Sequence, residues 1–351
     1  MTLEETLRQI GPPDETARAA ARARWDSRAK PLGSLGALET AVEDIAALTG
    51  SADVTLRPRT VVVFCADNGV TVRGVSQTDS SVTALAARQL AQGRTAVCRM
   101  AAAAECRVLG VDMGIAGFPG CEGLLDRRVG DGTADFTQGP AMSREQAERA
   151  VLTGVEIARC EAARGTRLLA AGELGIGNTT SASAVAAVLL GRSAEDVTGR
   201  GAGLSDDGLA RKLKAVRLAV STNRPAAWDP LDVLAKVGGF DLAGMCGLYL
   251  GGALCRVPVL IDGFPSAAAA LCALRLCPPA GRAMLASHCS AEPAAALLLR
   301  ALGKRAPIHA GLRLGEGTGA VAFMPLLDLA LSVYREGYSF EEGGIAPYTP
   351  Q

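Results

Sequence analysis

Residues 59–69 read RTVVVFCADNG: after Arg59 comes a run rich in β-branched residues, uncharged from Thr60 to Ala66, and Asp67 and Asn68 follow it. β-Branched and aromatic residues favour extended backbone, and a strand that is apolar on both faces must be covered on both sides. The strands of parallel sheets are buried in this way, because their crossover helices lie on the two faces. This stretch therefore predicts a central strand of a parallel sheet, with polar residues at its carboxyl end.

Four further short runs have the same character. They cover residues 106–114, 167–177, 256–264 and, more weakly, 283–290. Ala-rich stretches typical of helices cover residues 81–103, 143–164, 181–190 and 294–302. Strands that alternate with helices indicate an α/β fold, in which a parallel, Rossmann-like sheet is covered by helices.

Composition argues against two classes of partner. The chain has 36 basic and 36 acidic residues, and aromatic residues make up 4%. Nucleic-acid binding usually needs a basic excess and stacking aromatics, so we expect no nucleic-acid partner.

The longest uncharged apolar run, residues 242–255, is too short to cross a bilayer and predicts a buried helix. The N-terminus lacks the pattern of a secretion signal, so we expect a soluble, cytoplasmic protein without a membrane partner.

The cysteines and histidines give little support for a metal site. None of the ten cysteines forms a CxxC pair, and most lie in apolar runs, which favours buried free thiols in a reducing compartment. The only histidines are His288 and His309. We therefore expect no metal.

Polar residues collect at the ends of the predicted strands. Asp67 and Asn68 end the first strand, Glu173 lies in GELGIG, and Asp262 and Gly263 end VPVLIDGF. Ligands of parallel α/β sheets bind beyond the carboxyl ends of the strands. Each loop alone fits an ordinary βα turn, where Gly, Asp and Asn are common. Several such loops, each with an acid, favour one shared site.

The segment GELGIGNTT, residues 172–180, is the strongest local signal. Gly175 and Gly177 allow the backbone to approach a ligand, and free amides at the start of the following helix favour an anion. Thr179 and Thr180 add hydroxyl groups or a helix cap. The segment is neither a P-loop nor a Rossmann GxGxxG motif. It fits an anion site, and it also fits a capped turn without a ligand.

A second Gly-rich turn precedes a basic amphipathic helix within residues 197–220. Lys212, near the start of this helix, fits either a solvated face or a partner for a phosphate. We interpret Asp206 and Asp207 as an N-terminal helix cap.

The segment LRLGEGTG, residues 312–319, places one acid among three glycines just before a long apolar helix. Arg313 is a second candidate partner for a phosphate. Glu316 fits a general base, provided that it is partly buried, and the glycines leave room for a flat substrate. The alternative is that the Glu316 carboxylate only caps the following helix.

Eight segments together resemble one enzyme family. They are KPLGSLGALE, ADNGVTVRGVS, GELGIGNTT, GRGAGL, GGFDLAGMCG, PVLIDGF, SHCSAEP and LRLGEGTGA, and they span the chain from about Trp25 to the end. Their order and spacing closely resemble those of the nicotinate-nucleotide–dimethylbenzimidazole phosphoribosyltransferase family. Each segment is weak evidence alone, but eight colinear matches make chance similarity untenable.

The resemblance implies a reaction and its substrates. Ribose 5-phosphate would move from nicotinate mononucleotide to a benzimidazole nitrogen with inversion, giving alpha-ribazole 5′-phosphate and nicotinate for the lower ligand of cobalamin. Ribose-bound nicotinate is a cationic pyridinium that leaves as a neutral ring without help from a metal. The resemblance therefore implies no cofactor.

The resemblance also implies roles for individual residues. Glu316 matches the catalytic base, which would take the ring N–H proton. Glu173 matches an active-site acid that would stabilise the oxocarbenium-like sugar. The positions that serve the nucleotide and its phosphate match Gly175, Gly177, Asn178, Thr179, Lys212, Asp262, Gly263 and Arg313. The positions around the aromatic base match Ser76, Leu174 and Leu314, and Gly315 belongs to the same substrate-binding set.

Two departures leave the acceptor open. Asn68 stands where many members have histidine, and AAALLL follows SAEP where many have Gly-His, which leaves His288 as the only histidine there. Another benzimidazole, adenine or a phenol is therefore an alternative to dimethylbenzimidazole. A non-catalytic paralogue that senses the nucleotide or the base is a further alternative, although both Glu173 and Glu316 are retained.

The chain ends are expected to form a separate helical part. We expect a large α/β catalytic domain at residues 30–320 and a small helical domain from residues 1–29 plus 321–351. Two helices should flank a break at residues 31–33, and the last 20 residues should form a tail or an exchange arm. The family resemblance implies a homodimer.

Overall fold

The computed structural model describes residues 2–348, and its centre is a parallel sheet of six strands in the order β3-β2-β1-β4-β5-β6. All five strand pairs are parallel. The strands are β1 (Arg59–Ala66), β2 (Arg107–Gly114), β3 (Leu124–Asp126), β4 (Leu168–Leu174), β5 (Val259–Ile261) and β6 (Met284–Ala286).

Helices make up most of the remaining structure. In chain order they are α1 (Leu3–Arg8), α2 (Glu15–Asp26), α3 (Ala37–Thr49), η1 (Gly69–Arg73), α4 (Ser81–Ala91), α5 (Ala96–Ala103), α6 (Arg144–Ala163), α7 (Asn178–Leu190), α8 (Ala194–Val197), α9 (Asp206–Asn223), α10 (Pro230–Val237), α11 (Phe240–Leu254), α12 (Phe264–Leu276), η2 (Pro278–Arg282), α13 (Ala295–Ala301) and α14 (Thr318–Glu336).

Alternate residues of β1 belong to two different cores. Val62 and Phe64 pack with α6, α11 and α12 on one face of the sheet, whereas Val61, Val63 and Cys65 pack with α4, α5 and α14 on the other. The successive side chains of a strand point to opposite faces, so each face needs its own cover. The prediction of an α/β fold with a parallel sheet covered by helices is confirmed.

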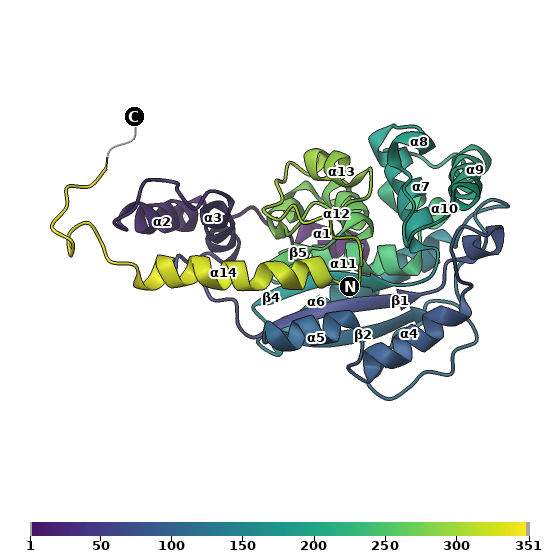
Figure 1. Cartoon of the computed structure of the whole chain (residues 1–351), viewed down its shortest axis with the longest axis horizontal. Helices are drawn as coiled ribbons and strands as arrows, with labels where there is room; N and C mark the ends of the chain where they lie inside the picture. The colour runs from purple at the N-terminus through teal and green to yellow at the C-terminus, as the bar shows by residue number, and fades with distance from the viewer. Residues whose placement is uncertain (1, 349–351) are drawn as a thin grey trace.

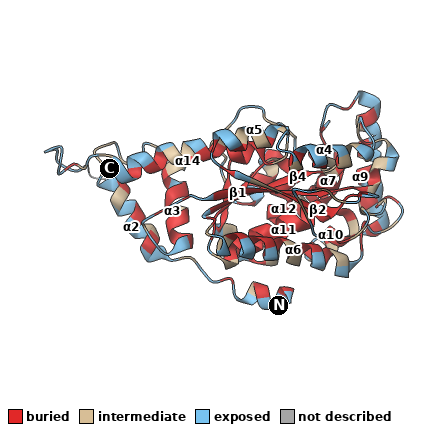
Figure 2. Ribbon diagram, turned by 90° about the horizontal axis from the view of Figure 1, so that it is seen from below, coloured by how far each residue is buried: buried red, intermediate tan, exposed pale blue. Residues whose placement is uncertain are grey.

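The predicted buried helix at residues 242–255 corresponds to α11. It is buried from Phe240 to Ala253 and lies under the sheet in the view of Figure 2. Within residues 2–348, no helix is long and apolar enough to cross a membrane. All ten cysteines are free thiols, but only Cys65, Cys106, Cys246, Cys272 and Cys277 are buried.

The structure differs from the sequence prediction in several elements. The helix predicted over residues 81–103 is two helices, α4 and α5, because Gly93 is left-handed and Thr95 is extended. The strands predicted at 256–264 and 283–290 shorten to three residues each, and the edge strand β3 was not predicted.

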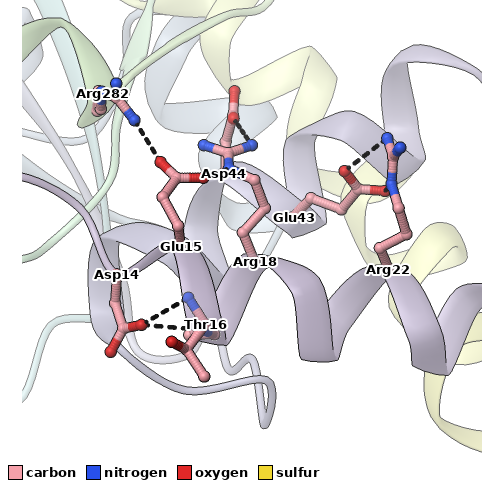
Figure 3. Close-up of polar contacts among 9 residues, drawn as sticks. Asp14, Glu15, Thr16, Arg18, Arg22, Glu43, Asp44 and Arg282 are labelled. Atoms are coloured by element: carbon pink, nitrogen blue, oxygen red, sulfur yellow. Dashed lines mark hydrogen bonds and ion pairs between the residues drawn. The ribbon is translucent and has the colours of Figure 1, made fainter.

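The helices α2, α3 and α14 pack together at one end of the molecule, where α14 connects them to the sheet (Figure 1). Figure 3 shows the ion pairs Arg18–Asp44 and Arg22–Glu43 between α2 and α3. Arg282 of η2 pairs with Glu15 and ties α2 to the main body.

The predicted domain boundaries stay a prediction. Helix α3, inside the expected large domain, packs on α2 and α14, while α1, inside the expected small domain, packs on α6 and α11. After α14 ends, the chain pairs with the segment that follows α2: the Phe340 amide donates to the Ser27 carbonyl, and the Ala29 amide donates to the Tyr338 carbonyl. Residues 349–351 of the expected tail lie outside the described residues.

Candidate active site

A cavity of about 240 Å³ opens beyond the carboxyl ends of β4 and β5. The expected site residues that line it come from four segments: Ser76, Glu173, Leu174, Gly175, Gly177, Asn178, Thr179, Gly263, Arg313, Leu314, Gly315 and Glu316. Lys212 and Asp262 lie behind this wall, since both are buried. The topology therefore brings the predicted loops to one place.

The turn at residues 315–317 lies directly on the end of β4. The Glu316 amide donates to the Glu173 carbonyl at 3.2 Å. A Cβ at Gly172 would lie 2.6 Å from the Glu316 carbonyl oxygen, and one at Gly315 would lie 2.9 Å from Glu173 Oε1. The absence of side chains at these two positions thus lets the two acidic segments approach each other.

Asp262 holds the start of α14 in place. Its Oδ2 accepts from the Gly317 amide at 3.1 Å, and its Oδ1 accepts from the Ala320 amide at 3.0 Å. A carboxylate at this place satisfies free amides of the first helical turn and favours the helix dipole. The geometry therefore makes Asp262 a support for the neighbouring Glu316, and its predicted contact with the substrate stays a prediction.

The Glu316 carboxyl group reaches the beginning of a different helix, so it does not cap α14. Its Oε2 accepts from the Val97 amide of α5 at 3.3 Å. Burial raises the pKa of Glu316, and hydrogen bonds from Val97 and Thr95 oppose this rise. Glu316 also has φ 60°, a strained value for a residue with a side chain. A partly buried carboxyl with a raised pKa suits a general base.

Glu173 stands among other acids at the cavity wall. Burial raises the pKa of Glu173 well above its usual value, and the nearby Asp262, Asp241 and Glu316 raise it further. Its side chain is almost completely buried. A positive charge brought into the cavity would stabilise the ionised form of Glu173.

The predicted anion loop has the expected geometry at the beginning of α7. Gly177 is the N-cap residue with φ 93°, and the first amides of α7 follow it. Lys212 Nζ donates to Thr179 Oγ1 at 2.8 Å, and the lysine is completely buried, which excludes the solvated face. Burial lowers the pKa of Lys212 to about 8, while Glu292 opposes this shift. An anion at Thr179 would therefore lie close to a buried cation.

The prediction that Asp206 and Asp207 cap α9 is wrong about which residue is the N-cap. Ser205 is the N-cap residue, and its Oγ accepts from the Gly208 amide at 3.2 Å. Asp206 and Asp207 lie in the first turn, where a negative charge favours the helix dipole. Asp206 also forms an ion pair with Arg200, which lines the cavity.

Asn68 lies beneath the anion loop and not on the cavity wall. Its Nδ2 donates to Asp241 Oδ2 at 3.3 Å, and its Oδ1 accepts from Ser181 Oγ at 2.6 Å. Burial raises the pKa of Asp241 to about 6. This buried network connects the end of β1 to the first turns of α7 and α11.

Three comparisons agree on the relationship of this chain to known proteins. A family profile described as Phosphoribosyltransferase matches residues 10–345. The chain is 43% identical over 349 residues to the nicotinate-nucleotide–dimethylbenzimidazole phosphoribosyltransferase of Acetivibrio thermocellus, covering 99% of each chain. It is 46% identical over 345 residues to the enzyme of the same name from Roseiflexus sp. (strain RS-1), covering 98% of each. The chain belongs to the nicotinate-nucleotide–dimethylbenzimidazole phosphoribosyltransferase family.

A solved structure supports the same assignment. The crystal structure of CobT from Thermus thermophilus has a TM-score of 0.90 and 43% sequence identity, covering 95% of this chain and 100% of the other. The family resemblance drawn from the eight sequence segments is therefore confirmed.

Sequence reasoning missed several residues at the cavity of this phosphoribosyltransferase. Those with polar or bulky side chains are Val75, Gln77, Thr83, Ile176, Arg200, Leu204, Phe264, Pro265, His288, Ser290 and Glu292. The segments GRGAGL and SHCSAEP contain five of them and contributed to the resemblance, so they were a usable signal. Burial lowers the pKa of His288, whose Nδ1 lies 3.1 Å from Ser287 Oγ. Among residues 2–348, no group of three His, Cys, Asp or Glu side chains is placed to hold a metal ion.

Proposed function

We propose that this phosphoribosyltransferase moves ribose 5-phosphate from nicotinate mononucleotide to a nitrogen of 5,6-dimethylbenzimidazole or a related lower-ligand base. The products are alpha-ribazole 5′-phosphate and nicotinate, used in cobalamin biosynthesis. The observation that carries the proposal is that Glu316, Glu173 and the α7 anion loop line one cavity. The names of the relatives supply the two substrates.

The anion loop is the proposed phosphate site. The first amides of α7 and the Thr179 hydroxyl would donate to phosphate oxygens. Lys212, which already donates to Thr179 Oγ1, would contribute its positive charge from behind the loop. Arg313, an exposed residue at the rim, is a second candidate partner.

Glu316 is the proposed general base. As one azole nitrogen attacks the anomeric carbon, the ring becomes positively charged unless the other nitrogen loses its proton. Glu316 would take this proton, and general-base catalysis of this kind typically contributes about 10²–10⁴ in rate. Leu174 and Leu314 offer apolar surface for the flat ring beside Glu316.

Glu173 would stabilise the positive charge that develops on the sugar. The bond from the anomeric carbon to the pyridinium nitrogen breaks with its electron pair, so nicotinate leaves as a neutral ring. The pyridinium and the oxocarbenium-like sugar both favour ionised Glu173, which otherwise has a strongly raised pKa. Each step uses groups of this chain and substrate, and none of them needs a metal.

We make three further proposals, on the oligomeric state, the location and the cofactor. In line with the family, we propose a homodimer, a cytoplasmic location and the absence of a cofactor. The pair of acids at the cavity supports an enzyme over a paralogue that only senses nucleotide.

Product analysis tests the proposed function. Purified protein is incubated with nicotinate mononucleotide and an equimolar mixture of dimethylbenzimidazole, adenine and p-cresol, and products are separated by chromatography. We expect alpha-ribazole 5′-phosphate as the main product together with free nicotinate. A dominant adenine or phenol product would establish the alternative acceptor, and no release of nicotinate with any base would contradict the proposal.

A further inference from the structure

His288 lies at the cavity wall on the loop that follows β6, although none of the proposed steps uses it. Its side chain is buried, and the ring fits because Gly319, in the first turn of α14, has no side chain. A Cβ at Gly319 would lie 2.0 Å from His288 Nδ1 and 2.1 Å from Cε1. The last glycine of the LRLGEGTG segment therefore makes room for this imidazole.

The contacts of Nδ1 fix the tautomer of the ring. Ser287 Oγ donates its proton to the Ile261 carbonyl at 2.6 Å, so toward His288 Nδ1, 3.1 Å away, it can only accept. Asp262 Oδ1 lies 3.9 Å from the same nitrogen and favours an N–H there over a lone pair. Burial lowers the pKa of His288 against the opposing effect of Asp262, which favours the neutral ring. A neutral imidazole with its proton on Nδ1 carries a lone pair on Nε2.

Nε2 is the ring nitrogen left for a ligand. Among residues 2–348 it has no hydrogen-bond partner, and it is not sealed from solvent as the unpartnered Oγ1 of Thr180 is. A Cβ at Gly263, on the cavity wall, would lie 3.7 Å from Nε2. The lone pair of His288 is therefore available at the cavity, where it can bind only a hydrogen-bond donor.

The segment of His288 connects the two parts of the proposed site. Asp262, next to the imidazole, accepts from the Gly317 amide at the start of α14. Four residues after His288, Glu292 accepts from the Gly201 amide at 3.0 Å, beside the anion loop. His288 thus lies between the two acids and the phosphate site, which are the two places that a bound ribose 5-phosphate would connect.

We propose that His288 Nε2 accepts a hydrogen bond from a ribose hydroxyl of nicotinate mononucleotide, an inference that rests on the proposed function. The phosphate dianion and the nicotinate carboxylate are themselves acceptors and cannot satisfy a lone pair. The azole N–H of the second substrate is taken by Glu316 in the proposed mechanism. The two ribose hydroxyls are the substrate donors that remain, and this bond would orient the sugar for attack by the base.

Deoxy analogues of the nucleotide test the inference in a double-mutant cycle. The dissociation constants of nicotinate mononucleotide and of its 2′-deoxy and 3′-deoxy forms are measured by calorimetry for the wild type, His288→Asn and His288→Gln. Asparagine can replace the Nδ1 donor but not Nε2, whereas glutamine can offer an amide oxygen in place of Nε2. The wild type should bind one of the analogues about tenfold more weakly than the parent nucleotide. His288→Asn should bind the parent about tenfold more weakly, with no further loss for that analogue, and His288→Gln should recover part of the affinity.

The tautomer can be measured on the unaltered protein, because the chain has only two histidines. Nitrogen-15 NMR of protein with labelled histidine should show His288 with a protonated Nδ1 and an unprotonated Nε2, and the Nε2 signal should shift when nicotinate mononucleotide is added. His309→Asn assigns the signals and is the matched control, because His309 is exposed and does not line the cavity. This variant should bind all three nucleotides like the wild type.

The inference is overturned if His288 carries its proton on Nε2, or if the wild type binds both deoxy analogues as tightly as the parent. It is also overturned if His288→Asn weakens all three nucleotides by the same factor, as a purely structural change would. Turnover with dimethylbenzimidazole is measured separately. A wild-type protein that releases no nicotinate would refute the proposed function, so the two failures are distinguishable.

Discussion

The backbone amide of Glu316 donates to the backbone carbonyl of Glu173 at 3.2 Å, so the two acids of the cavity are joined through their main chains. Glu173 is the last residue but one of β4, and Glu316 precedes Gly317, the N-cap residue of α14. The separation of the acids is therefore set by the sheet and a long buried helix. A site of this kind is built on rigid elements, which favours precise placement of both carboxyl groups.

Asp262 should support this geometry without contacting the reacting atoms. Asp262→Asn places an amide group against one of the two helix amides that the carboxylate now satisfies. We expect a loss of about 1–3 kcal/mol in the free energy of unfolding, together with a lower kcat. Chemical denaturation and steady-state kinetics measure both quantities.

The matched control for this variant is Asp14→Asn. Asp14 accepts from the Thr16 and Ala17 amides at the start of α2, far from the cavity. It should lower stability and leave kcat unchanged. A fully active, fully stable Asp262→Asn protein would contradict the supporting role.

Lys212 should make nucleotide capture sensitive to alkaline pH. Its pKa is lowered to about 8 by burial, so the side chain is charged below that pH and becomes neutral above it. Phosphate binding favours the charged form, and kcat/KM for nicotinate mononucleotide should therefore fall as the pH rises above about 8. Lys212→Met should have a lower kcat/KM and no such decline. An unchanged KM in Lys212→Met would show that the lysine does not serve the phosphate.

Glu173 should act mainly in the transition state. Glu173→Gln removes the negative charge and keeps the size of the side chain, so we expect kcat to fall about 10²-fold while the dissociation constant of the nucleotide changes little. Single-turnover kinetics and calorimetry separate the two effects. A normal kcat in Glu173→Gln would show that the charge of Glu173 does not stabilise the positively charged sugar in the transition state.

Metal removal should leave the activity intact. The leaving group is a neutral pyridine, and the proposed steps use only Glu316, Glu173 and the anion loop. Turnover after extensive dialysis against EDTA should equal that of the untreated protein. Loss of turnover that magnesium restores would contradict this mechanism.

The sequence predicted the parts of the fold that depend on continuous local patterns. β1 and β4 are buried throughout and contain long apolar runs, and Glu173 near the end of β4 identified the cavity edge. β3 has only three residues at the sheet edge and is not fully buried, so it has no apolar pattern to detect. The split between α4 and α5 was missed because Ala-rich helical composition continues on both sides of Gly93.

The roles of single side chains were less predictable, because they depend on contacts between distant segments. Asp262 follows a strand like a ligand-binding residue, yet its carboxylate faces amides 55 and 58 positions later in the chain. Lys212 lies in an amphipathic helix whose sequence also fits a solvated face, and the packing of α9 on α7 and its neighbours buries it. The contact between Val97 and Glu316 spans 219 positions and has no local signature.

The most direct test of the account is the variant Glu316→Gln, measured for turnover and for nucleotide binding in parallel. Glu336→Gln, an exposed acid at the far end of α14, is the matched control. We predict a loss of about 10²–10⁴ in kcat for Glu316→Gln, an unchanged dissociation constant for nicotinate mononucleotide and a fully active control. A Glu316→Gln protein that turns over at a near-normal rate would contradict the claim that Glu316 is the base.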